Sequence, residues 1–413
     1  MTAAVVSTGE ELVTGRCVDS GSVFIARTLL RAGIRVVEVR QVGDSIDDIR
    51  LSLEELSPRS RFIVVTGGLG PTEDDRTREA LAEWTGQVLV EHPQARAQLD
   101  QWFARLGRPI SVSNLRQTRM PQGAVLLTNP IGTAPGFSMD HGGTTVFCLP
   151  GVPEEMQRML VDAVVPEVRV RASLPAFSEQ HLKVVGLPES VVGERIAHWM
   201  QRSPPCVSVT IHGGVVDVCA LDVEDPAGER RLRETLSGMR EVLGDHVFAA
   251  ADQGIAAHVV ERLKAEKRTV AVAESCTGGA IASALVAIPG ASEVFVEGCV
   301  VYSEAAKLRI GVDQQLLDRR SPVSEAIALS MADAVRARAG TSHGLASTGF
   351  LGPDGGTAEC PVGTVFIAVS GPDRRVSRRL FLTGSREGIR ERAVVQALDL
   401  LRRELPGKSG SVR

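Results

Sequence analysis

The chain has 413 residues, too many for one compact core, and 43% of them are apolar, so it can bury several cores. Its net charge of −4 argues against a general nucleic-acid coat or a binder of anionic membranes. The N-terminus lacks the basic start of a signal peptide, and no apolar run approaches the roughly 20 residues of a bilayer span. The seven cysteines are scattered without a C-x-x-C pair, which indicates neither a zinc site nor a disulfide framework. We therefore expect a cytoplasmic protein.

The first 172 residues alternate strand-like and helix-like segments. Strands are expected at residues 3–7, 35–42, 62–66 and 145–149, and helices at 22–32 and 47–55. This order predicts an α/β domain with a mostly parallel sheet.

A small α+β module is expected over residues 173–250, after a linker at 173–175. Its strands are predicted at 182–185, 208–211 and 215–221, with a Gly213-Gly214 turn and a helix at 227–243. A third, α/β domain is expected over 251–406. Its helices are predicted at 258–266, 280–287, 325–339 and 386–405, and its strands at 270–273, 294–301, 364–370 and 378–382. Residues 407–413 are expected to form a flexible tail.

Four glycine-containing segments of the first domain stand at expected strand ends: 9–15, 66–75, 129–136 and 149–156. Glycine lets backbone N–H groups approach an anion closely, and ligands of open α/β sheets bind beyond the carboxyl ends of the strands. The adjacent carboxylates of Asp74 and Asp75 would suit a divalent metal such as Mg²⁺, which neutralises a pyrophosphate and activates water. The alternative for this pair is a solvated helix start, where Asp is also favourable.

The segment VVTGGLGPTEDDRT at 64–77 resembles the molybdopterin-binding fold of molybdenum-cofactor enzymes. The Pro-Thr after GGLG, together with GTAPG and LPGVP, resembles the CinA family branch of that fold more closely. The resemblance implies hydrolysis of ADP-ribose to AMP and ribose 5-phosphate with Mg, Mn or Co, and catalysis by Asp75. The metal ligands that it implies are Asp74, Asp75, Glu10 and Asp44. The substrate-binding residues that it implies are Gly67, Gly68, Gly70, Thr72, Asn114, Gly132, Thr133, Pro150 and Gly151.

The segment AESCTGG at 273–279 follows an expected strand and precedes an expected helix. Three of its residues, Ser275, Cys276 and Thr277, are potential nucleophiles on one turn. The N–H groups of Gly278 and Gly279 are candidate donors to an oxyanion. The alternatives are a helix cap for Ser275 and a small buried filler for Cys276.

A hydroxyl nucleophile needs a base, and Lys307 is the candidate. Only five of the 46 basic residues are Lys, and Lys can lose its proton whereas Arg effectively cannot. If residues 303–307 open a helix, Lys307 projects back toward Tyr302, which can relay a proton. The alternative for Lys307 is a solvated surface charge.

The third domain resembles the C-terminal domain of the CinA family in the order of AESCTGG, GCVVYSEAAK, STGFLGPDGGT, PVGTVFIAV and GSREGIRERAVVQAL. That family includes nicotinamide mononucleotide deamidases, so the resemblance implies metal-free hydrolysis of the carboxamide to nicotinic acid mononucleotide and ammonia. It implies catalysis by Ser275, Tyr302 and Lys307, and a homodimer. The substrate-binding residues that it implies are Cys276, Thr277, Gly278, Gly279, Thr348, Gly349, Arg386 and Arg390, the two arginines for the phosphate.

One motif departs from the family pattern, because Phe350 and Leu351 stand where Ile and Ala are usual. These bulkier side chains are expected to narrow the pocket. The middle module resembles a KH-type segment, but it has no GXXG loop, so we expect no RNA binding.

Two rival functions remain open. A molybdopterin-binding or adenylyl-transfer protein is compatible with GGLGPTEDD but is not expected to carry the AESCTGG domain. A non-catalytic partner in competence or DNA damage is the second rival, and the acidic composition argues against direct DNA binding.

Overall fold

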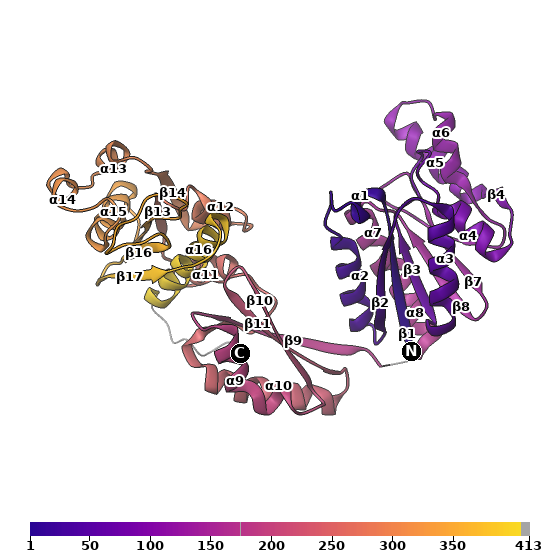
Figure 1. The fold of residues 1–413 in the computed structure, drawn as a ribbon, viewed down its shortest axis with the longest axis horizontal. Coiled ribbons are helices and arrows are strands. Elements are labelled where there is room, and N and C mark those ends of the chain that lie inside the picture. The colour runs from indigo at the N-terminus through magenta and orange to yellow at the C-terminus, as the bar shows by residue number, and fades with distance from the viewer. Residues whose placement is uncertain (174, 406–413) are drawn as a thin grey trace. The chain divides into compact units, whose positions relative to one another are not determined.

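The computed structural model describes residues 1–173 and 175–405, so the tail predicted at 407–413 lies outside the described residues. The chain divides into two compact units. The first comprises Met1–Ser178 with Val223–Asp225, and the second comprises Glu179–Asp222 with Pro226–Arg413 (Figure 1). The second unit thus contains both the α+β module and the α/β part that follows it.

The first unit is built on a six-stranded sheet in the order β2-β1-β3-β8-β7-β6. Its parallel strands are β1 (Thr2–Thr8), β2 (Arg35–Val42), β3 (Phe62–Thr66) and β8 (Thr144–Leu149). Strand β7 (Gly136–His141) runs antiparallel to both of its neighbours, β8 and β6 (Val125–Leu127). The mostly parallel α/β sheet predicted from the sequence is therefore confirmed.

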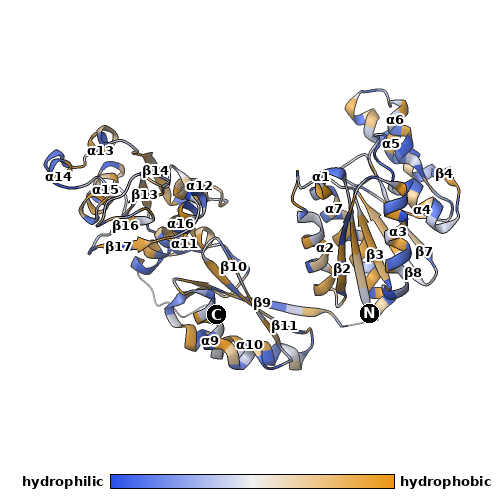
Figure 2. Cartoon of the chain, viewed as in Figure 1, coloured by the Kyte–Doolittle hydropathy of each residue, from blue (hydrophilic) through white to orange (hydrophobic). Residues whose placement is uncertain are grey.

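Helices cover both faces of this sheet, because its central strands are apolar on both sides. Helices α3 (Ile46–Leu56) and α4 (Thr77–Thr85) pack on the face of Ala4, Val6 and Val65. Helices α2 (Ser20–Arg31), α7 (Pro153–Met159) and α8 (Val165–Ala172) pack on the face of Val5 and Val64. Figure 2 shows the apolar residues concentrated along the central strands. The remaining elements are α1 (Glu10–Val13), β4 (Leu89–Glu91), α5 (Pro93–Leu106), α6 (Val112–Leu115) and β5 (Arg119–Pro121).

The second unit contains a four-stranded sheet in the order β10-β11-β9-β12. Its elements are β9 (Phe177–Val185), α9 (Glu189–Met200), β10 (Cys206–His212), β11 (Val215–Val223), α10 (Pro226–Leu243) and β12 (Val247–Ala249). Helices α9 and α10 cover the face that carries Leu182, Val184 and Val218.

A five-stranded sheet in the order β14-β13-β15-β16-β17 forms the rest of this unit. Its strands are β13 (Val270–Glu274), β14 (Phe295–Val300), β15 (His343–Gly349), β16 (Thr364–Ser370) and β17 (Arg375–Phe381). Its helices are α11 (Ile255–Ala265), α12 (Ala280–Val286), α13 (Glu304–Ile310), α14 (Gln314–Arg319), α15 (Glu325–Ala339) and α16 (Arg386–Glu404). One core joins the two sheets, since Val185 and Phe248 pack with residues of α11 and α16.

The helices of the described residues lack a segment with the length and apolar composition of a membrane span.

Candidate functional site

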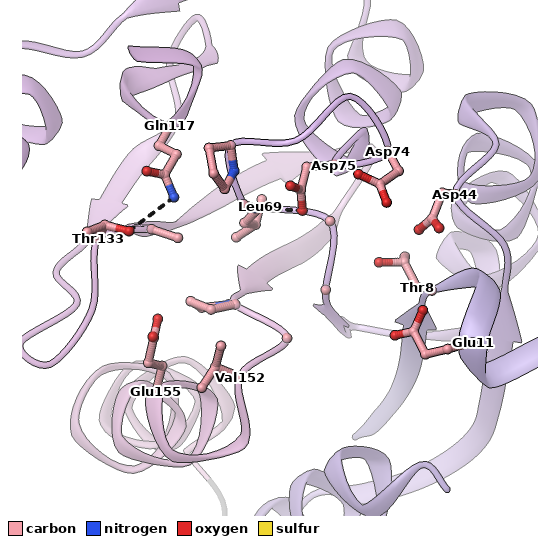
Figure 3. Close-up of a pocket in the computed structure, with 18 residues that line it drawn as sticks. Thr8, Glu11, Asp44, Leu69, Asp74, Asp75, Gln117, Thr133, Val152 and Glu155 are labelled. Carbon is pink, nitrogen blue, oxygen red and sulfur yellow. Dashed lines mark hydrogen bonds between the residues drawn. The ribbon is translucent and has the colours of Figure 1, made fainter. Parts of the chain in front are cut away.

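A pocket of about 370 Å³ lies beyond the carboxyl ends of β1, β3 and β8 in the first unit (Figure 3). Nine predicted site residues line it: Asp44, Gly67, Gly68, Gly70, Asp74, Asp75, Thr133, Pro150 and Gly151. Four others, Glu10, Thr72, Asn114 and Gly132, are not among its lining residues. Four polar residues that sequence reasoning missed also line it: Thr8, Glu11, Gln117 and Glu155.

The glycines after β3 are required by close packing. Gly67 and Gly68 have φ of 102° and 67°, which L side chains rarely adopt. A Cβ at Gly67 would lie 2.4 Å from the carbonyl oxygen of Thr8, and one at Gly68 would lie 2.2 Å from Thr77 Oγ1. The buried guanidinium of Arg78 holds the loop by donating hydrogen bonds to the carbonyls of Leu69 and Gly70. Burial lowers the pKa of Arg78 to about 10.

The glycine loop cradles an anion, and that anion is the carboxylate of Asp75. Its oxygens accept the N–H of Gly70 at 2.7 Å, the N–H of Thr72 at 2.8 Å and the hydroxyl of Thr72 at 2.5 Å. A carboxylate has about four acceptor positions, so little capacity remains for a metal. The structure thus gives Asp75 and Thr72 loop-forming contacts that the sequence did not reveal.

Three other carboxylates gather on one side of the pocket: Glu11, Asp44 and Asp74 (Figure 3). Burial raises the pKa of Asp44, and the nearby negative charges of Glu11 and Asp74 raise it further, against a hydrogen bond from the N–H of Glu10. Glu10 therefore orients Asp44 through its backbone at 3.0 Å, and the neighbouring Glu11 supplies the lining carboxylate. A bound cation would offset the repulsion among these carboxylates and lower the raised pKa of Asp44.

The opposite side of the pocket carries amide and hydroxyl groups. Asn114 Nδ2 donates to Gln117 Oε1 at 3.2 Å, and Gln117 Nε2 donates to Thr133 Oγ1 at 3.3 Å. Asn114 therefore holds the pocket residue Gln117 and does not itself line the pocket. Gly132 likewise makes room for Glu155, because a Cβ there would lie 2.2 Å from the Glu155 carboxylate.

A second pocket, of about 190 Å³, lies beyond the carboxyl ends of β13, β14 and β15 in the second unit. Seven predicted residues line it: Ser275, Cys276, Tyr302, Lys307, Thr348, Gly349 and Arg386. Phe350 and Leu351 line it as well, as their position in the motif led us to expect. Sequence reasoning missed Pro322, Val323 and Asp354.

Lys307 is only 2% exposed, although it lies in a short helix at the surface. Its Nζ donates to Ser275 Oγ at 3.2 Å and to the backbone carbonyl of Tyr302 at 3.3 Å. Burial lowers the pKa of Lys307, because a desolvated ammonium is disfavoured. The helix that carries it begins after Ser303, whose hydroxyl accepts the N–H of Ala306. The lysine is therefore buried beside a serine hydroxyl and is no solvated surface charge.

The three candidate nucleophiles have different surroundings. Ser275 meets Lys307, whereas Thr277 is fully buried and shares a 2.6 Å hydrogen bond with Ser347. Cys276 lines the pocket, but burial raises the pKa of its thiol to about 12, which disfavours the thiolate. Of the three, Ser275 is the one whose hydroxyl contacts the amine of Lys307.

The backbone N–H groups of Gly278 and Gly279, predicted to donate to an oxyanion, donate instead to neighbouring groups of the protein. The buried carboxylate of Glu274 accepts the N–H groups of Gly279 at 3.0 Å, Ile281 at 3.0 Å and Ala282 at 2.8 Å. The N–H of Gly278 is directed to the carbonyl of Ser275 at 3.3 Å, and neither glycine lines the pocket. The prediction for Gly278 and Gly279 therefore does not fit this arrangement. The signal was the acidic residue at the end of a strand that leads into a helix N-terminus.

Arg386 and Arg390 were both predicted to bind the substrate phosphate, but only Arg386 lines the pocket. Arg386 lines the pocket and its Nη2 donates to the hydroxyl of Tyr302 at 3.4 Å. Arg390, one turn later on α16, is paired with Glu387 and does not line the pocket. Tyr302 contacts Lys307 through its carbonyl, and its 66% exposed side chain lies beside Arg386, so these contacts do not form the predicted proton relay.

Comparison with known proteins covers both parts of the chain. Residues 252–405 match the CinA C-terminal domain, and residues 4–170 match the probable molybdopterin binding domain. A CinA-like protein of Myxococcus xanthus is 41% identical over 409 residues, covering 96% of this chain and 97% of the relative. A putative competence-damage inducible protein of Caldanaerobacter subterraneus is 35% identical over 413 residues, covering 99% of each.

Among solved structures, the protein CinA from Thermoplasma acidophilum is 32% identical and covers 41% of this chain and 97% of that one, with a TM-score of 0.38. The match to the Myxococcus protein extends over nearly the full length of both chains. The chain therefore belongs to the CinA family.

Proposed function

We propose that the second unit hydrolyses the carboxamide of nicotinamide mononucleotide to a carboxylate and ammonia. The contact between Lys307 Nζ and Ser275 Oγ carries this proposal. A buried lysine with a lowered pKa is a base at a pH where a solvated one is not. Serine and lysine together can replace the serine–histidine pair of other hydrolases.

The reaction proceeds in two halves. Neutral Lys307 takes the proton of Ser275 as Oγ attacks the carboxamide carbon. The same proton passes to the departing nitrogen, so ammonia leaves and an ester to Ser275 remains. Water then attacks the ester while Lys307 again accepts a proton, and that proton returns to Ser275 as the carboxylate product leaves.

The shape of the pocket agrees with a substrate of this kind. A volume of about 190 Å³ is less than the ~300 Å³ of an ordinary ligand pocket, so it suits the pyridine ring with the ribose phosphate at the mouth. The exposed ring of Tyr302 can face the positively charged pyridinium, which is attracted to an aromatic face. Arg386 beside it offers the guanidinium fork that matches a phosphate.

The test is ammonia release from nicotinamide mononucleotide by the full chain. We expect release by the wild type and none by Ser275→Ala. The matched variant Cys276→Ala changes the adjacent lining residue and is expected to retain activity. If Ser275→Ala stays active while Cys276→Ala does not, the nucleophile is wrong. If the wild type releases no ammonia, the proposed activity is wrong.

For the first unit we propose metal-dependent hydrolysis of ADP-ribose to AMP and ribose 5-phosphate. The observation that favours it is the charge of the pocket. Its described lining residues include five carboxylates, Glu11, Asp44, Asp74, Asp75 and Glu155, and no Lys, Arg or His. An anionic pyrophosphate enters such a pocket only with divalent cations.

The carboxylates of Glu11, Asp44 and Asp74 have the oxygen donors that Mg²⁺ or Mn²⁺ prefers. When bound, the metal would neutralise the pyrophosphate and activate water. Gln117 and Thr133 on the opposite side can donate hydrogen bonds to the substrate, while Asp75 keeps the loop in shape.

The experiment incubates the full chain with ADP-ribose and Mg²⁺, Mn²⁺ or Co²⁺ and measures AMP. We expect AMP with at least one metal and none with a chelator. Absence of AMP with every metal, together with tight binding of a pterin, would favour the molybdopterin-binding rival.

A further inference from the structure

A cluster of polar side chains lies on one face of the four-stranded sheet, away from both pockets. Glu179, His181 and Lys183 alternate along β9, so they point to the same face. Asp217 and Cys219 alternate along the neighbouring strand β11. The opposite face of the two strands forms the apolar core with α9 and α10. These side chains belong to one compact unit.

Three potential metal ligands converge in this cluster. Glu179 Oε1 lies 3.1 Å from His181 Nε2 and 3.4 Å from Cys219 Sγ, and all three atoms lie within 4.8 Å of one another. Tetrahedral Zn²⁺ with bonds of 2.0–2.3 Å holds its ligand atoms about 3.3–3.8 Å apart. The two distances from Glu179 Oε1 are within a few tenths of an ångström of this range, and the ring nitrogen and the thiol lie within 4.8 Å of each other, so one ion can join all three.

The imidazole of His181 is oriented for this role. Its Nδ1 meets both oxygens of Asp217, at 2.9 and 3.1 Å, which directs Nε2 toward Glu179 and Cys219. A histidine that binds a metal commonly donates its other ring N–H to a carboxylate, which fixes the tautomer. Lys183 holds that carboxylate in turn, with Nζ 2.9 Å from Asp217 and 2.8 Å from Asp252.

We propose that Glu179, His181 and Cys219 bind one Zn²⁺ ion, with Asp217 as a positioning residue for His181. The set of one thiolate, one imidazole and one carboxylate is typical of zinc and unlike the all-oxygen sets of Mg²⁺ or Ca²⁺. Two anionic ligands and one neutral ligand balance the charge of the ion. His181 is 4% exposed, so its imidazole is shielded from bulk solvent. Bound zinc links β9 to β11 and stabilises the folded sheet.

The site is independent of both proposed activities, so its test uses metal binding alone. The full chain is loaded with zinc, freed of excess by gel filtration, and its zinc content is measured per chain. We expect one equivalent of zinc that Cys219→Ser loses. Cys206→Ser, which changes an exposed cysteine on the neighbouring strand β10, is expected to retain it. Asp217→Asn is expected to bind zinc about 10–100-fold more weakly.

Cobalt distinguishes this site from the acidic pocket of the first unit. Co²⁺ bound to a thiolate gives a charge-transfer absorption in the near ultraviolet, and no cysteine lines that pocket. We expect the absorption in the wild type and in Asp44→Asn, and its loss in Cys219→Ser. Glu179→Gln provides a second variant if Cys219→Ser fails to fold. Equal zinc content in wild type and Cys219→Ser, or a cobalt adduct without thiolate absorption, would overturn the proposal in favour of a histidine held only by carboxylates.

Discussion

The two pockets occupy the same place in two α/β sheets but have opposite electrostatics. Each lies beyond the carboxyl ends of parallel strands, where loops from several strands meet. Among the described residues, the lining of the first unit's pocket has five carboxylates and no cationic side chain. The described lining of the second unit's pocket has one carboxylate, Asp354, and two cationic residues. Arg386 is one of these, and Lys307, buried beside Ser275, is the other.

We propose that the two pockets activate their nucleophiles in different ways. In the second unit we propose that the protein itself provides the base, because burial lowers the pKa of Lys307 and so favours the neutral form that can accept a proton. In the first unit burial and the negative charges of neighbouring carboxylates raise the pKa of Asp44. We propose that a bound divalent cation supplies positive charge there. Changes at the two pockets should therefore affect different reactions and respond differently to metal and pH.

Among the changes that keep Ser275, the largest effect is expected for Lys307→Arg. Arginine keeps the positive charge and a similar length but does not lose its proton, so deamidation should fall about 10²–10⁴-fold. The measurement is ammonia release, and AMP formation by the first unit should not change. Lys264→Arg, at a surface lysine paired with Glu293, is the matched control. Substantial activity in Lys307→Arg would show that the base is another group.

The pH profile sharpens the same assignment. Because burial lowers the pKa of Lys307, its neutral form appears below the ordinary lysine range. The kcat/KM for deamidation should rise about tenfold per pH unit and reach a plateau before pH ~10.5, the pKa of free lysine. A profile flat from pH 5 to 9 would contradict a lysine base.

Asp44→Asn should act on the first pocket alone. We expect AMP formation to fall about 10²-fold, because a ligand of the proposed metal is lost. The pKa of Asp44 is raised in the folded state, so its ionisation costs stability as pH rises above the unfolded value. Without metal at neutral pH the variant should therefore melt at a higher temperature than the wild type, while added Mn²⁺ should stabilise the wild type more. The opposite order of melting temperatures would contradict a raised pKa of Asp44 in the folded state.

The sequence predicts the elements best where the pattern is regular. The helix at 325–339 and the strand at 62–66 are found at the predicted bounds. The strand His343–Gly349 escaped prediction, because its residues are mainly small and carry no alternating pattern, although it is a buried central strand.

The pockets were located by the loops, but the partners of individual groups were not predictable. Asp75 accepts backbone N–H groups of its own loop, and Glu274 accepts those at the start of α12. Nothing in a list of residue types distinguishes such a carboxylate from a metal ligand. Glu10 and Glu11 differ by one position in a helical turn, which decides whose side chain enters the pocket. The cysteine spacing gave no sign of the proposed zinc site, because its ligands come from two strands about 40 residues apart in the chain.

Glu274→Gln should have a smaller effect on deamidation than the change at Lys307. An amide keeps the shape but accepts fewer of the three N–H groups that the carboxylate holds, which should destabilise the fold by about 1–3 kcal/mol. The turn that carries Ser275 would loosen, so kcat should fall while the pH profile keeps its position. Thermal unfolding and the pH–rate profile measure the two effects. A shifted profile would mean that Glu274 acts on Lys307 directly.

The smallest effect is expected at Phe350, and it tests whether pocket size limits the substrate. Phe350 is partly buried in the pocket wall, whereas Leu351 is part of the core, so only Phe350 can be reduced without the ~2–5 kcal/mol that a core Leu→Ala change costs. Phe350→Ile should widen the pocket and lower KM for nicotinamide mononucleotide a few-fold, with kcat nearly unchanged because Ser275 and Lys307 stay in place. An increase in KM would show instead that the phenyl ring itself contacts the substrate. In that case the bulky residue is a binding group, and the departure from the family pattern marks a different preference for substrate.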